Sequence, residues 1–201
     1  MSNAITKCAV LILAAGKSSR LGSPKQLLNF EGSALISRVA KTAIDAAIGE
    51  VFVVVGANAE EIVMELNMPD LYVVKNEEWE EGMASSIRNG LDQVQKSDPM
   101  VDGIMILVCD QPYLNADTLR EILHQQRASG HAMAASVYHD QVGTPAVFHR
   151  SIFPALMELR GDTGARKIVS AYGEQVALVP FEKGIIDIDT REDYEKLIHN
   201  Q

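Results

Sequence analysis

The sequence predicts an α/β protein with three layers, in which helices cover both faces of a mixed, mainly parallel β-sheet. Short β-branched or apolar runs alternate with helical patterns up to about residue 130, and the last third of the chain is richer in strands. Strands that alternate with helices are typical of parallel sheets with right-handed crossovers. The length of 201 residues suits one domain with a full core, which we expect to span residues 1–201.

The first half of the chain carries the regular alternation. Its central strand is predicted from an uninterrupted apolar run, because a strand that is buried on both faces shows no polar alternation. Ser33 is predicted to cap the first helix, and Gly49 is predicted to end it. The expected elements are strands at 7–13, 51–55 and 71–74 and helices from Ser33 to Ala47 and over 59–66.

The second half begins in the same way and then gains strands. Asn115 and Thr190 are of the residue types that accept hydrogen bonds from the first turn of a helix. Gly143-Thr144-Pro145 is expected to lead into a short strand. The expected elements are helices at 84–95, 116–128, 152–159, 165–172 and after Thr190, and strands at 104–108, 131–138, 146–148, 176–179 and 185–188.

The composition argues against several classes of protein. The net charge is −9, so we expect no broad attraction to nucleic acid or to an anionic membrane. No apolar run reaches membrane-spanning length, and the N-terminus lacks a signal-peptide pattern. The two cysteines, Cys8 and Cys109, lack metal-ligand spacing and cannot build a disulfide framework, which favours a reducing, cytoplasmic compartment.

Residues 10–26 join a buried strand to a loop of small and cationic residues. Small residues let a ligand approach the backbone, whose N–H groups then point at an anion, and cations supply the charge. The small residues are Ala14, Ala15 and Gly16, and the cations include Lys17, Arg20 and Lys25. Neither G-x-x-x-x-G-K-[ST] nor G-x-G-x-x-G is present, so this is a phosphate loop of another kind.

A carboxylate follows a second buried strand, since Asp110 comes directly after the run that ends at Cys109. Ligands of open α/β sheets bind beyond the carboxyl ends of the strands. If the two strands are neighbours, the cationic loop faces Asp110, as a nucleotide with Mg²⁺ requires. A plain turn residue before Pro112 is the alternative of about equal weight.

The loop resembles the signature of a known family. L-A-A-G-x-S-x-R-x-G-x-x-K is filled from Leu13 to Lys25, and it is similar to the signature of nucleotidyltransferases with the Rossmann-like nucleotide-diphospho-sugar transferase fold. The stretch N-E-E-W-E-E-G-M-A-S-S-I-R at 76–88 most resembles molybdenum cofactor cytidylyltransferases, which transfer CMP from CTP to molybdopterin. Further matching stretches are C-D-Q-P at 109–112, G-T-P at 143–145, G-D-T-G-A-R at 161–166 and D-I-D-T-R-E-D-Y at 187–194.

The resemblance implies roles for the nucleotide side. Lys25, Arg20 and Asp110 would be catalytic, with both cations on the triphosphate. Mg²⁺ would bind Asp110 and Asp189, with Asp187 as the rival second ligand. Guanylyl-transferring relatives carry L-A-G-G, so the Cβ of Ala15 would narrow the base pocket for a pyrimidine. The implied nucleotide-binding residues are Leu13, Ala14, Ala15, Gly16, Arg20, Lys25, Gly82, Ser86 and Asp110.

The acceptor side rests on weaker signals. Amides at a helix start near Ser85 suit a phosphate, but a helix cap, a packed tryptophan and ordinary turns explain the same residues equally well. The implied acceptor-binding residues are Trp79, Ser85, Ser86, Arg88, Gly143, Thr144 and Asp162.

The implied partners are CTP and a molybdopterin-type acceptor, and a molybdoenzyme client is a further candidate. Nucleic acid and membrane are not expected as partners. We expect a monomer or a weak homodimer. Two alternatives stay open: a nucleotidyltransferase that uses another NTP or another acceptor, such as a sugar phosphate or an alcohol phosphate, and a non-catalytic accessory protein that binds the molybdenum cofactor.

Overall fold

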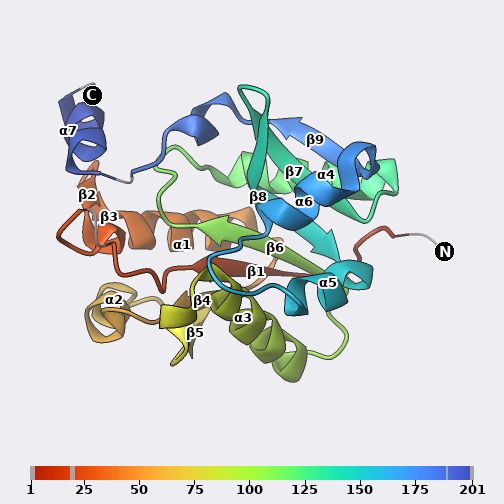
Figure 1. Cartoon of the computed structure of the whole chain (residues 1–201), viewed down its shortest axis with the longest axis horizontal. Coiled ribbons are helices and arrows are strands. Elements are labelled where there is room, and N and C mark those ends of the chain that lie inside the picture. The colour runs from red at the N-terminus through yellow and green to blue at the C-terminus, as the bar shows by residue number, and fades with distance from the viewer. Residues whose placement is uncertain (1–2, 19–20, 189, 200–201) are drawn as a thin grey trace.

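A computed structural model describes residues 3–18, 21–188 and 190–199. Within these residues, seven strands form one sheet in the order β5-β4-β1-β6-β8-β7-β9, and β2 and β3 form a small separate hairpin (Figure 1). The strands are β1 (Cys8–Leu13), β2 (Asn29–Phe30), β3 (Ser33–Ala34), β4 (Gly49–Val55), β5 (Leu71–Lys75), β6 (Gly103–Val108), β7 (Met133–Tyr138), β8 (Gln141–His149) and β9 (Val176–Pro180). The sheet is mixed and mostly parallel, as predicted.

Helices cover both faces of this sheet, so the predicted three-layer architecture is confirmed. Alternate residues of each strand point to opposite faces, and the buried side chains divide accordingly into two large clusters. One cluster joins the strands to α1, α2 and α4, and the other joins them to α3, α5 and α6. The helices are α1 (Leu35–Ala46), α2 (Ala59–Glu65), α3 (Met83–Ser97), α4 (Ala116–Ser129), α5 (Phe153–Met157), α6 (Arg166–Tyr172) and α7 (Arg191–His199).

Strand β8 runs against all the other strands of the sheet. It pairs antiparallel with β6 on one side and with β7 on the other, whereas β1–β4, β1–β6, β4–β5 and β7–β9 are parallel pairs. The carboxyl ends of the other six strands therefore lie at one edge of the sheet. Ligand sites are expected at that edge.

Two predicted helix starts are confirmed by their hydrogen bonds. The side chain of Asn115 accepts a bond from the Thr118 amide at the start of α4. At the start of α7, Thr190 Oγ1 accepts a bond from the Asp193 amide, and the Asp193 carboxylate accepts one from the Thr190 amide. The two residues thus form a reciprocal capping pair.

Some predicted boundaries are wrong. Ser33 lies in β3 and caps no helix. Helix α1 ends at Ala46, with Ala47 as a left-handed C-cap, and Gly49 opens β4. Residues 143–145 lie inside β8, which is longer than the predicted 146–148. No strand forms over 185–188, where a short 3₁₀ helix, Glu182–Ile185, is followed by irregular chain.

A small cluster fastens the last helix to the rest of the protein. Phe30, Leu35, Ile188 and Leu197 pack together, and Tyr194 Oη donates a hydrogen bond to the backbone oxygen of Asn29. Helix α7 thereby lies beside β2 and β3 (Figure 1). None of the described helices is both long enough and apolar enough to cross a bilayer.

Candidate functional site

The predicted meeting of a cationic loop and a carboxylate is present at the carboxyl edge of the sheet. Strands β1 and β6 are parallel neighbours with Leu13 opposite Val108, so the loops that follow them begin side by side. Lys25 Nζ lies 2.5 Å from Asp110 Oδ2, and the side chains are only 20% and 16% exposed. Charged groups that are largely buried need a partner of opposite charge, and Lys25 and Asp110 provide this for each other.

A buried glutamine shapes the loop after β1. Gln26 is 1% exposed, and its Nε2 donates to the backbone oxygens of Ala14, at 2.9 Å, and of Gly16, at 2.8 Å. Ser18 Oγ donates to Gln26 Oε1 and accepts from the Lys25 amide. The loop therefore folds around Gln26, and the neighbouring Lys25 faces the cavity beside Asp110.

Ala15 lies in a tight wall with Gly56 and Trp79. A Cβ built on Gly56 would stand 2.5 Å from the Cβ of Trp79 and 2.9 Å from the Cβ of Ala15, closer than side chains pack. Glycine at this position is what allows Trp79 to lie against the end of β4. The Ala15 methyl group and the Trp79 side chain thus close the same side of the loop.

The start of α3 is held by buried polar side chains. Asn76 is 1% exposed, and its Nδ2 donates to Ser85 Oγ at 2.9 Å and to Ser86 Oγ at 3.0 Å. Ser85 Oγ donates in turn to the backbone oxygen of Gly82. Ser85 is therefore part of the framework, whereas Ser86 also faces a cavity.

Arg88 belongs to a clamp that fixes the loop between α5 and α6. Its guanidinium makes a double hydrogen bond with the Glu81 carboxylate, at 2.9 and 2.6 Å, and a third bond to the backbone oxygen of Leu159. Glu81 also accepts a bond from the Gly161 amide. These bonds to Arg88 and Gly161 lower the pKa of Glu81 to about 2.

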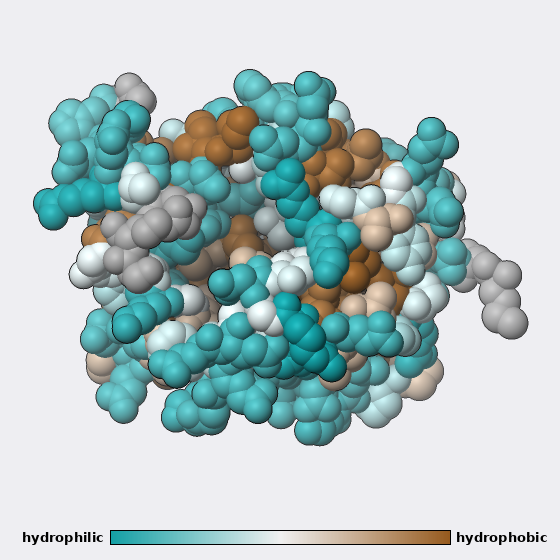
Figure 2. Space-filling model, viewed as in Figure 1, coloured by the Kyte–Doolittle hydropathy of each residue, from teal (hydrophilic) through white to brown (hydrophobic). Residues whose placement is uncertain are grey.

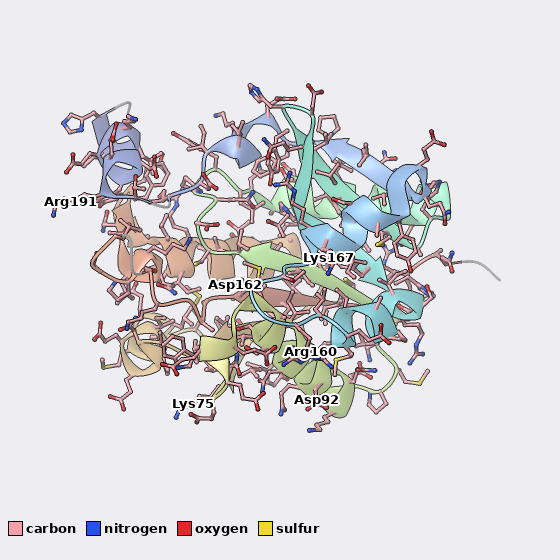
Figure 3. All side chains as sticks on the ribbon, in the orientation of Figure 1. Lys75, Asp92, Arg160, Asp162, Lys167 and Arg191 are labelled. Carbon is pink, nitrogen blue, oxygen red and sulfur yellow. The ribbon has the colours of Figure 1, made fainter. Side chains whose placement is uncertain are left out.

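The clamped loop brings Asp162 against Gly82. Gly82 has a φ of +119°, and a Cβ there would stand 2.5 Å from Asp162 Oδ1, so both the backbone conformation and the close approach require glycine. The Asp162 carboxylate lies at the N-terminal end of α3, where the helix dipole favours negative charge. Figure 3 shows Asp162 on the loop that crosses in front of α3.

Two cavities open along this edge, and three residues, Met83, Val108 and Asp110, line both. Figure 2 shows this face of the molecule hollowed near its middle, with apolar residues at the bottom of the hollow. The first cavity, of about 460 Å³, is lined by the loop after β1, by Asp162, by the end of β6 with Asp110, and by Trp79, Glu80, Gly82, Met83 and Ser86 around the start of α3. The second cavity, of about 500 Å³, lies toward β7, β8 and the 3₁₀ helix Glu182–Ile185.

The predicted site residues divide between these cavities. The first takes Leu13, Ala15, Gly16, Lys25, Gly82, Ser86 and Asp110 of the predicted nucleotide set, and Trp79 and Asp162 of the predicted acceptor set. The second takes Asp110, Gly143, Thr144 and Asp187. Buried Ala14 lies behind the loop, and neither Ser85 nor Arg88 is among the described residues that line a cavity. Arg20 and Asp189 lie outside the described residues.

Sequence reasoning missed the residues that build the second cavity. Tyr138 is the last residue of β7, so its position at a strand end was a signal that could have found it. Burial raises the pKa of Tyr138, and the charges of Asp187 and Asp110 act in the same direction. Buried Gln111 donates from Nε2 to the backbone oxygens of Thr144 and Gly184, at 3.0 Å each.

Cys109 is fully buried between Val108 and Asp110. Burial raises the pKa of its thiol to about 12. A thiol with this pKa stays protonated at neutral pH, so Cys109 is a packing residue and not a nucleophile.

The donor set around Asp110 fits a small divalent cation. Mg²⁺ binds one or two protein carboxylates and keeps water or phosphate oxygens as its other ligands. Asp110 and Asp187 both line the second cavity. Among the described residues, no three histidine, cysteine or acidic side chains gather into an all-protein metal site.

The chain is similar to several known proteins. A family model described as a MobA-like NTP transferase domain matches residues 10–176. The chain is 30% identical to nicotine blue oxidoreductase of Paenarthrobacter nicotinovorans over 197 residues, covering 94% of this chain and 95% of that protein. It is 32% identical to the purine catabolism protein PucB of Bacillus subtilis over 198 residues, covering 92% and 93%.

Solved structures share the fold. The crystal structure of Rv0371c from Mycobacterium tuberculosis superposes with a TM-score of 0.85 at 31% identity, covering 96% of this chain and 98% of that one. A second structure of Rv0371c, in complex with manganese, gives a TM-score of 0.81 at 28% identity and covers 98% and 100%.

Proposed function

Because the chain belongs to the family of MobA-like NTP transferase domains and is therefore a nucleotidyltransferase, we propose that it transfers CMP from CTP to molybdopterin and releases pyrophosphate. The observation that carries the proposal is the pairing of Lys25 with Asp110 at the mouth of a loop of small residues. This arrangement provides a cation for the triphosphate, a carboxylate for a metal and close access to the backbone.

The wall of the first cavity supports a pyrimidine donor. The Ala15 methyl group and Trp79 stand on the same side of the loop, and Gly56 allows them to approach. A glycine in place of Ala15 would deepen this side of the cavity, as a purine needs. This wall therefore supports CTP over GTP as the proposed donor.

The reaction needs no strong base, because the phosphate of the acceptor is already anionic. One of its oxygens attacks the α-phosphorus of CTP, and the bond from that phosphorus to the bridging oxygen breaks. Pyrophosphate leaves with the electron pair. Lys25 holds the phosphates in line, and Asp110 binds the cation. We propose Mg²⁺ as that cation, and when bound it neutralises charge on the phosphates.

The test is a screen of the four NTPs for pyrophosphate release, with and without molybdopterin, in Mg²⁺ and separately in Mn²⁺. We expect release from CTP only when molybdopterin is present. Equal release from GTP would overturn the choice of CTP, and no release from any NTP would overturn the proposed reaction.

Variants of the ion pair test the assignment of roles. Lys25→Ala and Asp110→Asn should each lower kcat by about 100-fold or more, because each removes charge stabilisation at the phosphates. Lys41→Ala and Asp92→Asn are matched controls, since both side chains are exposed on helices and pair only with a helical neighbour. Loss of activity in the controls, or full activity in the ion-pair variants, would contradict the assignment.

A further inference from the structure

The second cavity is built around Tyr138. A Cβ on Gly143 would stand 2.1 Å from Tyr138 Oη, and a Cβ on Gly184 would stand 2.9 Å from Cδ1 of the Tyr138 ring. A side chain at either position would collide with the ring, which lies against the bare backbone of β8 at Gly143 and of the 3₁₀ helix Glu182–Ile185 at Gly184. The side chain of Tyr138 is therefore held in one place at the end of β7.

Gln111 connects the backbone around Gly143 and Gly184 to the loop that carries Asp110. Its amide nitrogen bonds two backbone oxygens, those of Thr144 and Gly184, which flank or belong to the two glycine positions. Both partners are carbonyl oxygens, so the orientation of the Gln111 amide is fixed by its donors. These bonds tie the residue after Asp110 to the two backbone segments that pack against Tyr138.

Two hydrogen-bond donors face this cavity without a protein partner. Within the described part of the chain, neither the Tyr138 hydroxyl nor the Arg166 guanidinium makes a side-chain hydrogen bond or ion pair, and both residues line the second cavity. The Arg166 charge also acts on the Tyr138 hydroxyl, so the two groups share one electrostatic environment. Donors of this kind are matched by an anionic oxygen ligand.

We propose that Tyr138 and Arg166 bind the phosphate of the acceptor in the second cavity, and that they thereby select phosphomonoester acceptors over neutral alcohols. The inference rests on the proposed nucleotidyl transfer and specifies its acceptor side. Arg166 supplies a planar, permanently charged donor for phosphate oxygens, and Tyr138 adds a single donor. The phosphate would lie beside Asp110, which lines both cavities.

A neutral alcohol is a poorer match for the same cavity. An alcohol must lose a proton before or during attack, so it needs a general base near the reacting oxygen. None of the described lining residues is a histidine, and both carboxylates of the lining, Asp110 and Asp187, already have interaction partners. A phosphomonoester needs donors instead, and these are present.

The test compares two variants of neighbouring residues on α6. Arg166→Gln removes the proposed phosphate ligand. Lys167→Gln removes the same charge from the next residue on α6, which is not among the residues that line the second cavity. Binding of inorganic phosphate and of molybdopterin is measured by calorimetry for the wild-type chain, both variants and Tyr138→Phe, and CTP binding is measured alongside. Lys25→Gln is titrated with inorganic phosphate as well, as a probe of the first cavity.

We expect Arg166→Gln to weaken phosphate and molybdopterin binding by about 10- to 100-fold, as loss of a charged hydrogen bond does. Tyr138→Phe should weaken both by about 3- to 10-fold, the usual effect of one neutral bond. Lys167→Gln should leave both within about twofold. CTP binding should not change in any of the three variants.

Three other outcomes distinguish failure of the proposed phosphate site from failure of the proposed function. Unchanged phosphate affinity in Arg166→Gln would overturn the inference even if pyrophosphate release from CTP is observed. Loss of phosphate binding in Lys25→Gln but not in Arg166→Gln would place the anion in the first cavity, which also overturns it. Arg166-dependent phosphate binding without any molybdopterin binding would support the phosphate site and contradict the proposed acceptor.

Discussion

Gln26 illustrates how one uncharged side chain determines the form of the loop after β1. Its amide nitrogen satisfies two backbone oxygens that the turn after β1 leaves without a partner. Buried backbone oxygens without a partner are costly, so the loop conformation depends on this residue even though it carries no charge to offer a ligand.

Replacing Gln26 with leucine tests this dependence. Gln26→Leu keeps the size of the side chain but removes both donors, so we expect a loss of about 2–3 kcal/mol in the free energy of unfolding and weaker CTP binding. Urea denaturation and calorimetry measure the two effects. Gln125→Leu is the control, because Gln125 makes only one bond, to Glu121 on the same helix. Equal destabilisation of the two variants would contradict the role given to Gln26.

At this scale the sequence was informative about some residues and silent about others. Lys25 and Asp110 could be predicted because each follows a recognisable buried strand, and the parallel sheet brings those strand ends together. Gln26 and Gln111 could not be predicted, because their roles depend on contacts that only the folded chain creates, whereas the place of Tyr138 at the end of a strand was a usable signal. Gln111, for example, bonds residues 33 and 73 positions away.

At the scale of elements, the clamp between Glu81 and Arg88 joins the start of α3 to the loop before α6. The pKa of Glu81 is about 2, below its ordinary value of 4.5, because the ionised form is bound by Arg88 and Gly161. A carboxyl group with a lowered pKa adds stability that is fully present above pH 4.5 and is lost as the pH falls toward 2.

Glu81→Gln should therefore reduce the dependence of stability on pH in that window. Urea denaturation at pH 6 and at pH 3 should show a smaller difference for Glu81→Gln than for the wild-type chain. Glu80→Gln removes a carboxyl group from the same 3₁₀ turn, one that has no ion-pair partner among the described residues, and should behave like the wild type. An unchanged difference in Glu81→Gln would mean that the clamp does not depend on the charge of Glu81.

The element boundaries that sequence patterns missed share a physical reason. The run at 185–188 is apolar, yet Ile185 and Ile186 are each 40% exposed and pair with no strand, while Ile188 packs under α7. Gly143 to Pro145 reads as a turn by composition, yet these residues belong to β8, where glycine is needed to seat Tyr138. In both cases the local sequence favours one conformation, and tertiary packing imposes another.

At the scale of the whole molecule, the sheet is divided where parallel β6 meets antiparallel β8. Residues of the first cavity come mainly from one side of this boundary and residues of the second cavity from the other, with Asp110 shared. The fold class was predictable from the alternation of strands and helices. The place where the sheet divides was not, because the strand-rich C-terminal third of the chain indicated a mixed sheet without indicating which strand is antiparallel.

The division predicts that the two substrates can be affected separately. Gly143→Ala places a methyl group where the Tyr138 hydroxyl lies, so we expect it to displace Tyr138 and weaken binding of inorganic phosphate by about tenfold, the loss of roughly one to two hydrogen bonds. CTP affinity should stay within about twofold. Calorimetric titrations with each ligand measure both values, and a parallel loss of CTP affinity would show that the two sides are not independent.

The reversal of β8 also bears on how a chain of this kind diverges. Under the proposed assignment, substitutions in β7, β8 and the 3₁₀ helix Glu182–Ile185 would change which acceptor is admitted, while the strands beside the first cavity keep their pairing and their core. The reaction type would then be inherited from one part of the sheet and the choice of acceptor from the other. Members of such a lineage can acquire new acceptors without rebuilding the machinery that activates the nucleotide.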